Sequence, residues 1–538
     1  MAETEPSAHL PTGQRPVAPQ SGDLNSEPPH DEAPRSVPPR SDLPRSGAGG
    51  PDPSGSGDAD LAAAGPPPTV PAAAAQASDP VGSAPSGPRH LVSIDDISID
   101  EMSALFEHAD RFAADPRGFA DAAPGFISAS LFYEPSTRTR LSFESAMLRL
   151  GGGVLTAAEM TSSSVVKGES LADTIRVVGG GYADVVVLRH PSEGAARLAS
   201  MYSAVPVINA GDGSHEHPTQ TLCDLYNLHV ERGSIEGLDV VLAGDLKYSR
   251  TVHSFAYALA RFKANIVCVP QPGLELPPYV VERLENEFGV NPVRADARRL
   301  GHLAADSDAV YLTPQKPHQL SLFTDAKGWE VAQVDAVYMT RPQTERYSEQ
   351  DLSQTAYLRL EKRAMAAESL RDAVVMHPLP RRDEISPEVD ADPRSIYFKQ
   401  AARGVPIRMA ILAWLLGRVD LGAASPRSAR PTHPVPAGPN PCPNPSCISR
   451  TEARHVGPRI RLESARSDAA RPERPRARCG YCTRVIQYEV VGCSSSRLFH
   501  APEAPAVRQI LPEHLVLFET PGAAEQHGFR AAMSAQPG

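Results

Sequence analysis

The sequence contains no apolar run long enough to cross a membrane. Its longest strongly apolar stretch, MAILAWLL at residues 409–416, falls well short of the about 20 residues that a transmembrane helix needs. The chain also starts without the basic, apolar and small-residue pattern of a secretory signal peptide. We therefore expect a soluble, cytoplasmic protein with no membrane partner.

An excess of positive charge is missing as well. The chain has 53 Lys and Arg residues against 64 Asp and Glu residues, which gives a formal net charge of −11. General nucleic-acid binders usually carry a basic excess, so this balance argues against such a partner. Any site for an anion must be built locally from a few side chains.

Residues 1–88 have almost no aromatic or branched apolar side chains. Pro, Gly, Ser, Ala and Asp dominate this segment. Such a composition cannot bury enough apolar surface to offset the entropy that is lost on ordering. We predict a disordered N-terminal extension that acts as a solvating tail or linker; docking through its Pro-rich pieces is the alternative.

From about residue 90, short apolar runs alternate with longer helical patterns, which is typical of α/β units with mainly parallel sheets. The region 90–420 exceeds the size that one hydrophobic core usually serves. We therefore predict two lobes, each with a mainly parallel sheet flanked by helices, and a seam at ERGSIEG (231–237). The predicted strands are residues 125–132, 183–190, 204–211, 237–244, 264–270, 308–313, 335–340 and 372–380.

The stretch FYEPSTRTRLSFESAMLRLGGG, residues 132–153, gathers hydrogen-bond donors at a predicted helix start. Ser136 or Thr137 suits the N-cap, apolar residues follow at helical spacing, and the glycines at 151–153 end the helix. A helix start favours an anion, and the hydroxyls and arginines add donors directed at the same point. The pattern predicts a phosphate site; an ordinary capped helix with solvent-facing arginines is the alternative.

This stretch resembles the carbamoyl-phosphate loop of aspartate and ornithine carbamoyltransferases. Further motifs resemble those of aspartate carbamoyltransferases, in family order: SSSVVKGESLADT (162–174), VLRHPSEGAARLA (187–199), NAGDGSHEHPTQTLCDL (209–225), GDLKYSRTVHS (244–254), YMTRPQTER (338–346) and HPLPR (377–381). Ornithine enzymes typically have a cysteine in the motif that reads HPLP here, whereas Pro378, Arg250 and Arg341 suit a dicarboxylate substrate. The resemblance implies transfer of the carbamoyl group of carbamoyl phosphate to L-aspartate in pyrimidine biosynthesis.

The resemblance also implies a division of the α/β region. Residues 89–232 would form a carbamoyl-phosphate-binding lobe, completed by a helix at 400–418, and residues 233–399 would form an aspartate-binding lobe. Two features depart from the family pattern: Val166 replaces a second lysine that some members have, and the segment 312–334 lengthens the second lobe. The boundaries around that segment are therefore the least defined by sequence.

Each residue of the expected carbamoyl-phosphate site has a role by resemblance. The helix start would hold the phosphate, and Arg189 would bridge the phosphate and the carbonyl oxygen. His217 and Thr139 would donate to that oxygen as negative charge develops on it, while Gln220 and two backbone carbonyls would accept from the carbamoyl NH2. The full set is Ser136, Thr137, Arg138, Thr139, Ser163, Arg189, His217, Gln220, Leu379 and Pro380.

The two carboxylates of aspartate would be bound by Arg250 and Arg341, assisted by Gln343 and Lys167, because the planar fork of Arg matches a carboxylate. In the family, the loop that contains Lys167 and Ser163 reaches the active site of the adjacent subunit, so a homotrimer with shared sites, or a higher oligomer, is expected. The amine attacks the carbonyl carbon directly. No covalent nucleophile and no organic cofactor are therefore needed.

The C-terminal part contains C-x4-C and C-x2-C pairs, CPNPSC and CGYC. Two such pairs can close a tetrahedral zinc site, and four thiolates leave no open position for catalysis. We predict a structural zinc held by Cys442, Cys447, Cys479 and Cys482, with Cys493 left as a spare. A nucleic-acid-binding ribbon is the alternative, but the motifs resemble the zinc domain of the aspartate carbamoyltransferase regulatory chain.

The linker at 420–441 is too short to hold the nucleotide-binding domain of that regulatory chain. We therefore expect the zinc domain at 442–493 to brace the catalytic part, with no separate regulatory chain and no nucleotide control through the missing domain. Residues 494–538 have no assigned role. Two alternative functions remain: a carbamoyltransferase for another amine such as ornithine, and a non-catalytic scaffold with the same fold.

Overall fold

The computed structural model describes residues 87–158, 168–296, 303, 307–313, 334–341, 359–367, 370–422, 433–434, 442–463, 476–511 and 514–532. The described elements belong to one structural unit, Gly82–Gly538. Almost all of the predicted N-terminal extension lies outside the described residues. Among the helices that the structure does describe, none combines the length and apolarity that crossing a membrane requires.

The first lobe is built on a parallel four-stranded sheet with the order β2-β1-β3-β4. Its strands are β1 (Ile127–Phe132), β2 (Gly153–Ala158), β3 (Val185–His190) and β4 (Val207–Asp212). Its helices are α1 (Ile99–Ala114), α2 (Thr137–Arg149), α3 (Leu171–Gly181), α4 (Ala195–Tyr202) and α5 (Pro218–Arg232), and α10 (Tyr397–Leu415) returns to it from the second lobe. This arrangement confirms the predicted α/β class.

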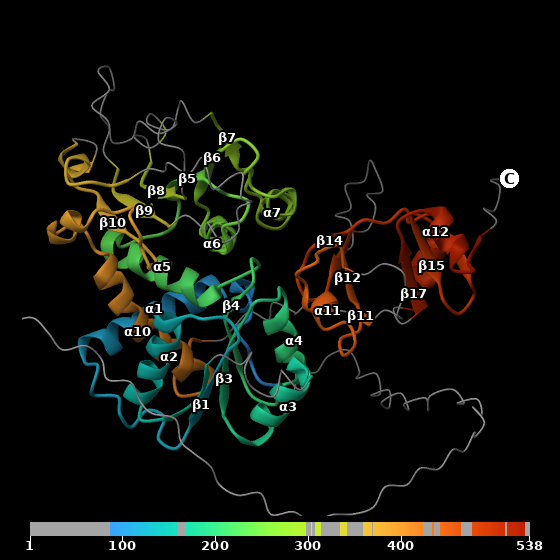
Figure 1. The fold of residues 1–538 in the computed structure, drawn as a ribbon, viewed down its shortest axis with the longest axis horizontal. Helices are drawn as coiled ribbons and strands as arrows, with labels where there is room; N and C mark the ends of the chain where they lie inside the picture. The colour runs from blue at the N-terminus through green and yellow to red at the C-terminus, as the bar shows by residue number, and fades with distance from the viewer. Residues whose placement is uncertain are drawn as a thin grey trace, which may run out of the picture. The chain divides into compact units, whose positions relative to one another are not determined.

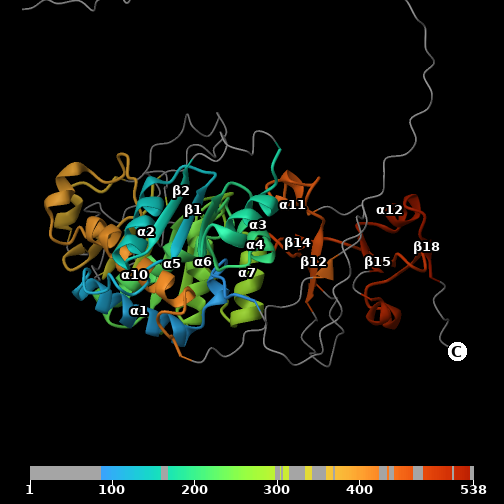
Figure 2. The same ribbon diagram turned by 90° about the horizontal axis from the view of Figure 1, so that it is seen from below.

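The two faces of this sheet are covered by different helices (Figure 1). Alternate residues of β3 point to opposite sides: Val185 and Val187 pack in a core with α1, α2, α5 and α10, whereas Val186 and Leu188 pack in a second core with α3 and α4. The view in Figure 2 shows the same layering from below. Because both faces are buried, β3 is apolar along most of its length rather than alternating.

Helix α2 begins within the motif that carries the donors, at Thr137. Ser136 occupies its N-cap position, and the helix ends at Arg149, before the three glycines. Gly151 has φ +83°, and a Cβ there would lie 1.6 Å from the carbonyl oxygen of Ala120. The chain therefore needs glycine at the position where the sequence predicts the helix to end.

The second lobe has a parallel six-stranded sheet with the order β10-β9-β8-β5-β6-β7. Its strands are β5 (Asp239–Gly244), β6 (Asn265–Pro270), β7 (Val293–Arg294), β8 (Ala309–Leu312), β9 (Ala336–Met339) and β10 (Val374–Met376). Its described α-helices are α6 (Arg250–Arg261) and α7 (Pro278–Arg283). The prediction of two lobes with mainly parallel sheets is thus confirmed.

The C-terminal part contains two antiparallel-rich sheets. The first has the order β11-β12-β13-β14 and the second β17-β15-β16-β18, in which β16 and β18 are parallel. The strands are β11 (His433–Pro434), β12 (Arg459–Glu463), β13 (Arg476–Cys479), β14 (Val485–Ile486), β15 (Val490–Cys493), β16 (Leu498–His500), β17 (Leu515–Phe518) and β18 (Arg530–Ala531), with helices α11 (Ile448–Thr451) and α12 (Pro521–Gln526). The second sheet thus includes residues beyond 493, to which the sequence assigned no role.

Candidate active site

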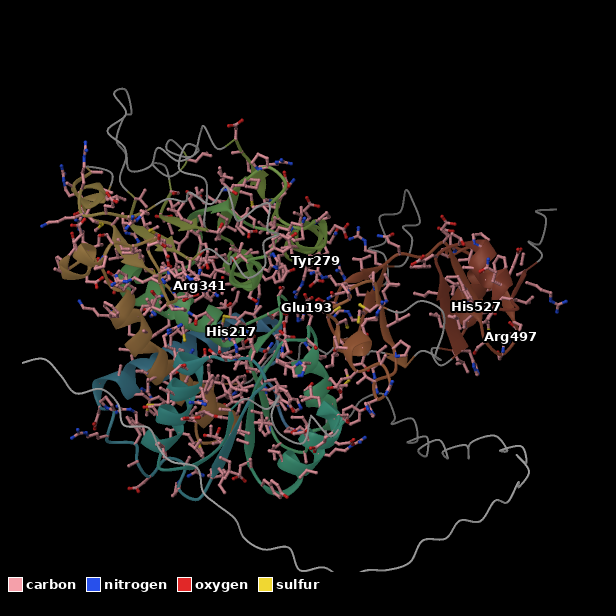
Figure 3. The ribbon with its side chains drawn as sticks, in the orientation of Figure 1. Glu193, His217, Tyr279, Arg341, Arg497 and His527 are labelled. Carbon is pink, nitrogen blue, oxygen red and sulfur yellow. The ribbon has the colours of Figure 1, made fainter. Side chains whose placement is uncertain are left out.

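The carboxyl ends of β1, β3 and β4 meet at one edge of the first sheet. The donor-rich motif follows β1, Arg189 lies near the end of β3, and Gly211 lies near the end of β4. His217 is the N-cap residue of α5, which starts after β4 (Figure 3). Residues far apart in the sequence are therefore gathered where open α/β sheets usually bind ligands.

Arg189 and His217 are both buried at this edge. Arg189 is 7% exposed, and His217 is 5% exposed. The Arg189 guanidinium donates through Nη1 to the carbonyl oxygen of Ala210 (3.1 Å) and forms an ion pair through Nη2 with Glu134 (3.2 Å). These contacts fix the guanidinium next to the helix start. Arg189 can therefore supply a pre-oriented positive charge.

Gly211 makes room for both side chains. It has φ +115°, and a Cβ there would lie 3.0 Å from Nη1 of Arg189 and 3.4 Å from Cδ2 of His217. The guanidinium and the imidazole thus approach the same piece of backbone. A larger residue at this position would push at least one of these two groups out of place.

The ring of His217 contacts its own helix, and its backbone is held from the second lobe. Its Nδ1 lies 3.3 Å from the hydroxyl of Thr219, and its backbone N–H donates to Oγ of Ser254 on α6 (3.4 Å). An imidazole in a fixed orientation at a helix start can donate a hydrogen bond to a developing oxyanion.

The start of α2 presents the motif residues to different degrees. Thr139 is buried, Ser136 is half-buried, and Thr137 and Arg138 are exposed. Although Arg138 is exposed, the partial desolvation of its guanidinium and the nearby charge of Arg341 hold its pKa below the usual range. Two arginines from the two lobes therefore repel each other at this place, and an anion between them would relieve that repulsion.

Gln220 and the HPLP segment carry the groups expected to hold an amide. Nε2 of Gln220 donates to Oδ1 of Asp224 (2.8 Å). The backbone N–H of Leu379, which has φ +51°, donates to Nδ1 of His377 (2.8 Å), and the other ring nitrogen lies 2.8 Å from Glu384. Both segments are thus fixed by hydrogen bonds to buried side chains.

The comparisons with known proteins cover these two lobes. Residues 89–230 match the carbamoyl-P binding domain of the aspartate/ornithine carbamoyltransferases, and residues 236–415 match the Asp/Orn binding domain. The aspartate carbamoyltransferase catalytic subunit of Thermoplasma acidophilum is 44% identical over 332 residues, which are 61% of this chain and 98% of the relative. That of Methanococcus maripaludis is 45% identical over 332 residues, with the same two shares.

This chain belongs to the aspartate/ornithine carbamoyltransferase family. Among solved structures, the catalytic subunit of M. jannaschii aspartate transcarbamoylase is similar at 42% identity with a TM-score of 0.50, covering 61% of this chain and 98% of that one. The aspartate transcarbamoylase of Trypanosoma cruzi in complex with carbamoyl phosphate and aspartate is 35% identical with a TM-score of 0.50, covering 61% and 95%.

The structure of this carbamoyltransferase brings together part of the predicted site. The helix-start residues, Arg189 and His217 lie at one sheet edge, as described above. Arg341 follows β9, and its positive charge lowers the pKa of Arg138 in addition to desolvation. Ser163, Lys167 and Gln343 lie outside the described residues, as does the side chain of Arg250, whose backbone begins α6.

Sequence reasoning missed three polar residues around the site. Glu134 pairs with Arg189, and Asp224 and Gln400 are buried behind Gln220. Glu134 stands inside the quoted donor motif, and Asp224 follows Gln220 at the i,i+4 spacing at which helix side chains meet. That spacing and the position of Asp224 inside the quoted motif 209–225 are the signals that could have identified it.

The four predicted metal ligands of this carbamoyltransferase form one cluster. The sulfurs of Cys442, Cys447, Cys479 and Cys482 all lie within 4.8 Å of one another, and all four residues are buried. The described cysteines carry free thiols, with sulfur separations of 3.4 Å between Cys442 and Cys482 and 3.7 Å between Cys447 and Cys479. A tetrahedral zinc with bonds of about 2.3 Å needs sulfurs about 3.8 Å apart, so the cluster could hold a metal.

The cysteine-bearing module contacts the first lobe through Glu193, in the turn between β3 and α4 (Figure 3). Its carboxylate accepts from Nδ2 of Asn444 (2.7 Å), its N–H donates to the carbonyl of Ser446, and its carbonyl accepts from the N–H of Ile448, both at 2.9 Å. Glu193 is only 3% exposed. These bonds connect the lobe directly to the C-x4-C loop.

A second contact lies next to the first. Gly194 has φ +81°, and a Cβ there would approach the backbone carbonyl carbon of Tyr481 to 2.6 Å. His215, two residues before His217, bridges Asp212 (3.0 Å) and the hydroxyl of Thr483 in the module (3.1 Å). The cysteine module therefore packs against the segment that leads into α5.

Proposed function

We propose that this chain is an aspartate carbamoyltransferase, which converts carbamoyl phosphate and L-aspartate into N-carbamoyl-L-aspartate and phosphate for pyrimidine biosynthesis. The observation that carries the proposal is the meeting of Thr139, Arg189 and His217 at one sheet edge, beside the repelling pair Arg138 and Arg341. Relatives of 44–45% identity named aspartate carbamoyltransferase catalytic subunit support aspartate as the acceptor.

The proposed reaction needs positioning and charge stabilisation only. The aspartate nitrogen forms a bond to the carbonyl carbon, negative charge gathers on the carbonyl oxygen, and the bond from carbon to the phosphate oxygen then breaks. Thr139, Arg189 and His217 would stabilise that oxygen. The departing phosphate, held by Ser136, Thr137 and Arg138, would accept the proton that the amine loses.

The aspartate side of the site remains a proposal by resemblance. Arg250 and Arg341 would bind the two carboxylates, with Gln343 and Lys167 assisting. The Arg138–Arg341 repulsion supports this assignment, because a site that binds a phosphate and a dicarboxylate side by side needs several positive groups at short range.

A carbamoylation assay of the purified full chain tests this proposal. Carbamoyl phosphate is supplied with either aspartate or ornithine, and the carbamoylated amine and the phosphate are both quantified. We expect product with aspartate and at least about 1,000-fold less with ornithine, because an ornithine side chain would place a cation against two arginines. Product with ornithine alone, or with neither amine, would overturn the proposal.

We also propose that the working unit is a homotrimer in which each site takes Ser163 and Lys167 from a neighbouring subunit. Leu141, Leu148 and Leu155 on α2 and β2 are exposed, at 51%, 61% and 47%. Strand β2 is an edge strand and leads into the segment 159–167 that contains both residues. An apolar edge of this kind favours association.

Mixing two inactive variants tests the shared site. Arg138→Ala and Lys167→Ala chains are each expected to be inactive alone, and subunit exchange between them should restore activity, since a mixed trimer contains sites with both intact residues. A mass measurement by light scattering should give a multiple of three chains. A monomeric active enzyme, or no recovery on mixing despite subunit exchange, would contradict the proposal.

The third proposed feature is a structural zinc on Cys442, Cys447, Cys479 and Cys482 in a fused module. Four buried thiols at the observed separations fit a closed tetrahedral site, in which zinc supplies a cross-link and no catalysis. A cytoplasmic location, which we also propose, would keep the thiols reduced and available to the metal. Metal analysis of the purified chain should give one zinc per chain.

A further inference from the structure

Asp224 is a buried carboxyl on α5, one turn after Gln220, and is 1% exposed. Two side-chain amides from different helices donate to the same oxygen, Oδ1: Nε2 of Gln220 at 2.8 Å and Nε2 of Gln400, on α10, at 3.1 Å. A buried carboxyl is tolerated when such donors satisfy it. Asp224 therefore ties the start of α5 to α10.

The first of these bonds decides which end of the Gln220 amide is left for a substrate. Because the nitrogen is committed to Asp224, the remaining end is the oxygen Oε1, which can only accept. Rotating the amide by half a turn would bring its oxygen against the Asp224 carboxyl oxygen. Asp224 thus makes Gln220 an acceptor.

The second bond leads to the HPLP segment. Gln400 donates to Asp224 through Nε2 and accepts the backbone N–H of His377 at 2.9 Å through Oε1. The His377 ring then accepts the N–H of Leu379 (2.8 Å), and its opposite nitrogen lies 2.8 Å from Glu384. Because Nδ1 of His377 accepts a hydrogen bond, Nε2 carries the ring proton and donates it to the Glu384 carboxylate.

We propose that Asp224 is a positioning residue that fixes both sets of acceptors for the carbamoyl NH2, and so makes the site prefer carbamoyl phosphate over acyl phosphates without that group. The proposal rests on the proposed function, in which Gln220 and the carbonyls near Leu379 and Pro380 receive the NH2. Asp224 itself does not contact the substrate in this proposal. Its effect passes through Gln220 on one side and through Gln400 and His377 on the other.

The surroundings of Asp224 set its charge. Arg408 on α10, Tyr338 on β9, Tyr311 on β8 and Cys223 on α5 are the charged or titratable groups that interact with it. Burial raises the pKa of Asp224 to about 7, although the two amides, the Tyr338 hydroxyl and the charge of Arg408 favour the ionised form. At pH 8 the carboxylate is ionised, and its hydrogen bonds to the two amides are at their strongest.

Two substitutions separate the negative charge of Asp224 from its acceptor oxygen. Asp224→Asn keeps an acceptor oxygen for Gln220 and Gln400, whereas Asp224→Ala removes it. Asn227→Ala is the matched control: Asn227 is also fully buried on α5 and bonds the carbonyl of Cys223 at 2.7 Å. This variant therefore measures the effect on binding of removing a buried polar side chain from the same helix, about one turn after Asp224.

The readout is the ratio of the acetyl phosphate Ki to the carbamoyl phosphate KM, measured at pH 8 with saturating aspartate. Acetyl phosphate has a methyl group in place of the NH2 and leaves the acceptors unpaired. We expect Asp224→Ala to raise the carbamoyl phosphate KM by about 10–100-fold, the scale of a misplaced binding group, and the acetyl phosphate Ki by less than about threefold. The ratio should stay within about threefold of wild type in Asp224→Asn and Asn227→Ala, which preserve the acceptor.

An Asp224→Ala enzyme with an unchanged ratio would overturn the proposal, as would an Asp224→Asn enzyme with a ratio as low as that of Asp224→Ala. A general loss of folding would lower activity without changing the ratio, and thermal melting of each variant measures such a loss separately. Wild-type protein that forms no N-carbamoyl-L-aspartate would defeat the proposed function instead. An active wild type whose ratio does not depend on Asp224 defeats this inference alone.

Discussion

The sheet edge of the first lobe and the cysteine cluster of the C-terminal module gather groups of opposite charge type: cationic side chains at the first, and potential thiolates at the second. The sheet edge gathers positive groups, and desolvation together with the nearby charge of Arg341 lowers the pKa of Arg138. The cysteine cluster gathers four sulfurs that become anionic thiolates when they bind a metal. Each cluster would therefore be completed by a ligand of the opposite charge.

The two clusters differ in what surrounds them. At the sheet edge Thr137 and Arg138 are exposed, whereas all four cysteines are buried and two of them flank the loop that bonds Glu193. An open cluster can exchange its ligand in each turnover. A closed one keeps its ligand, so loss of the metal should disturb structure more than chemistry.

The largest expected effect comes from the open cluster. Arg138→Ala should lower kcat/KM for carbamoyl phosphate by about 1,000-fold, because it removes a donor that we propose binds the phosphate. Thermal stability should not fall, since the substitution also removes the repulsion with Arg341. The matched control is Arg140→Ala, in the same turn, which loses only a half-exposed ion pair with Glu144 at 3.6 Å. Equal losses of activity in both variants would contradict a specific role for Arg138.

The closed cluster should respond in the reverse way. Cys447→Ser is expected to bind less than about a tenth of the zinc of wild type, because a serine hydroxyl is a much poorer ligand than a thiolate. Amide hydrogen exchange in residues 442–463 should speed up, while kcat falls less than about tenfold, since the metal takes no part in the chemistry. Cys493→Ser, outside the cluster, is the control. A fully loaded Cys447→Ser protein would contradict the ligand assignment.

The link between the module and the first lobe is expected to have a smaller effect. Glu193→Ala removes a buried carboxylate that accepts from Asn444 and leaves that amide without its partner, at a cost of about 1–3 kcal/mol. Urea unfolding followed by fluorescence measures the loss. Glu193→Gln keeps an acceptor and should lose less than Glu193→Ala. Identical unfolding midpoints for wild type and Glu193→Ala would show that the contact does not stabilise the fold.

The buried carboxyl of Asp224, which Gln220 contacts, gives a pH-dependent comparison. Burial raises the pKa of Asp224 to about 7, whereas an unfolded Asp titrates near about 4. The folded state therefore binds the proton more tightly, and this carboxyl lowers stability increasingly as pH rises from about 4 to 7. Asp224→Asn should be more stable than wild type by about 1–3 kcal/mol at pH 8, with a gap that shrinks toward pH 5. A gap that grows on acidification would contradict this sign.

The smallest expected effect is that of nucleotides. The linker is too short for a nucleotide-binding domain, so ATP and CTP should leave the apparent aspartate affinity unchanged within about twofold, well below the coupling usual for an allosteric effector. Steady-state assays at subsaturating aspartate measure this. A clear shift by either nucleotide would place an effector site elsewhere in the chain.

Much of the first lobe could be predicted from the sequence, because its signals are local. The apolar run before Ser136, the helical spacing after it and the glycines that end α2 each reflect backbone geometry, and the structure has each of them. The gathering of Arg189 and His217 at the same edge follows from the rule that parallel strands bring their carboxyl ends together.

The features that sequence reasoning missed depend on tertiary contacts. Gln400 meets Asp224 across 176 residues of chain, and no local pattern encodes that meeting. Strands β15 and β16 have four and three residues, too few for an alternating pattern to stand out from a loop. Glu193 reads as part of a family motif, yet its carboxylate bonds Asn444 in the distant module.

Direct observation of the transferred group tests the central claim most sharply. Full-length protein is mixed with carbamoyl phosphate labelled with ¹³C at the carbonyl and with ¹⁵N-labelled L-aspartate, and the reaction is followed by ¹³C NMR. The account predicts that the carbonyl signal becomes a doublet through one-bond coupling to ¹⁵N, at the rate at which phosphate appears, and that Arg138→Ala slows both together. Phosphate release without the doublet would mean hydrolysis rather than transfer and would contradict the account.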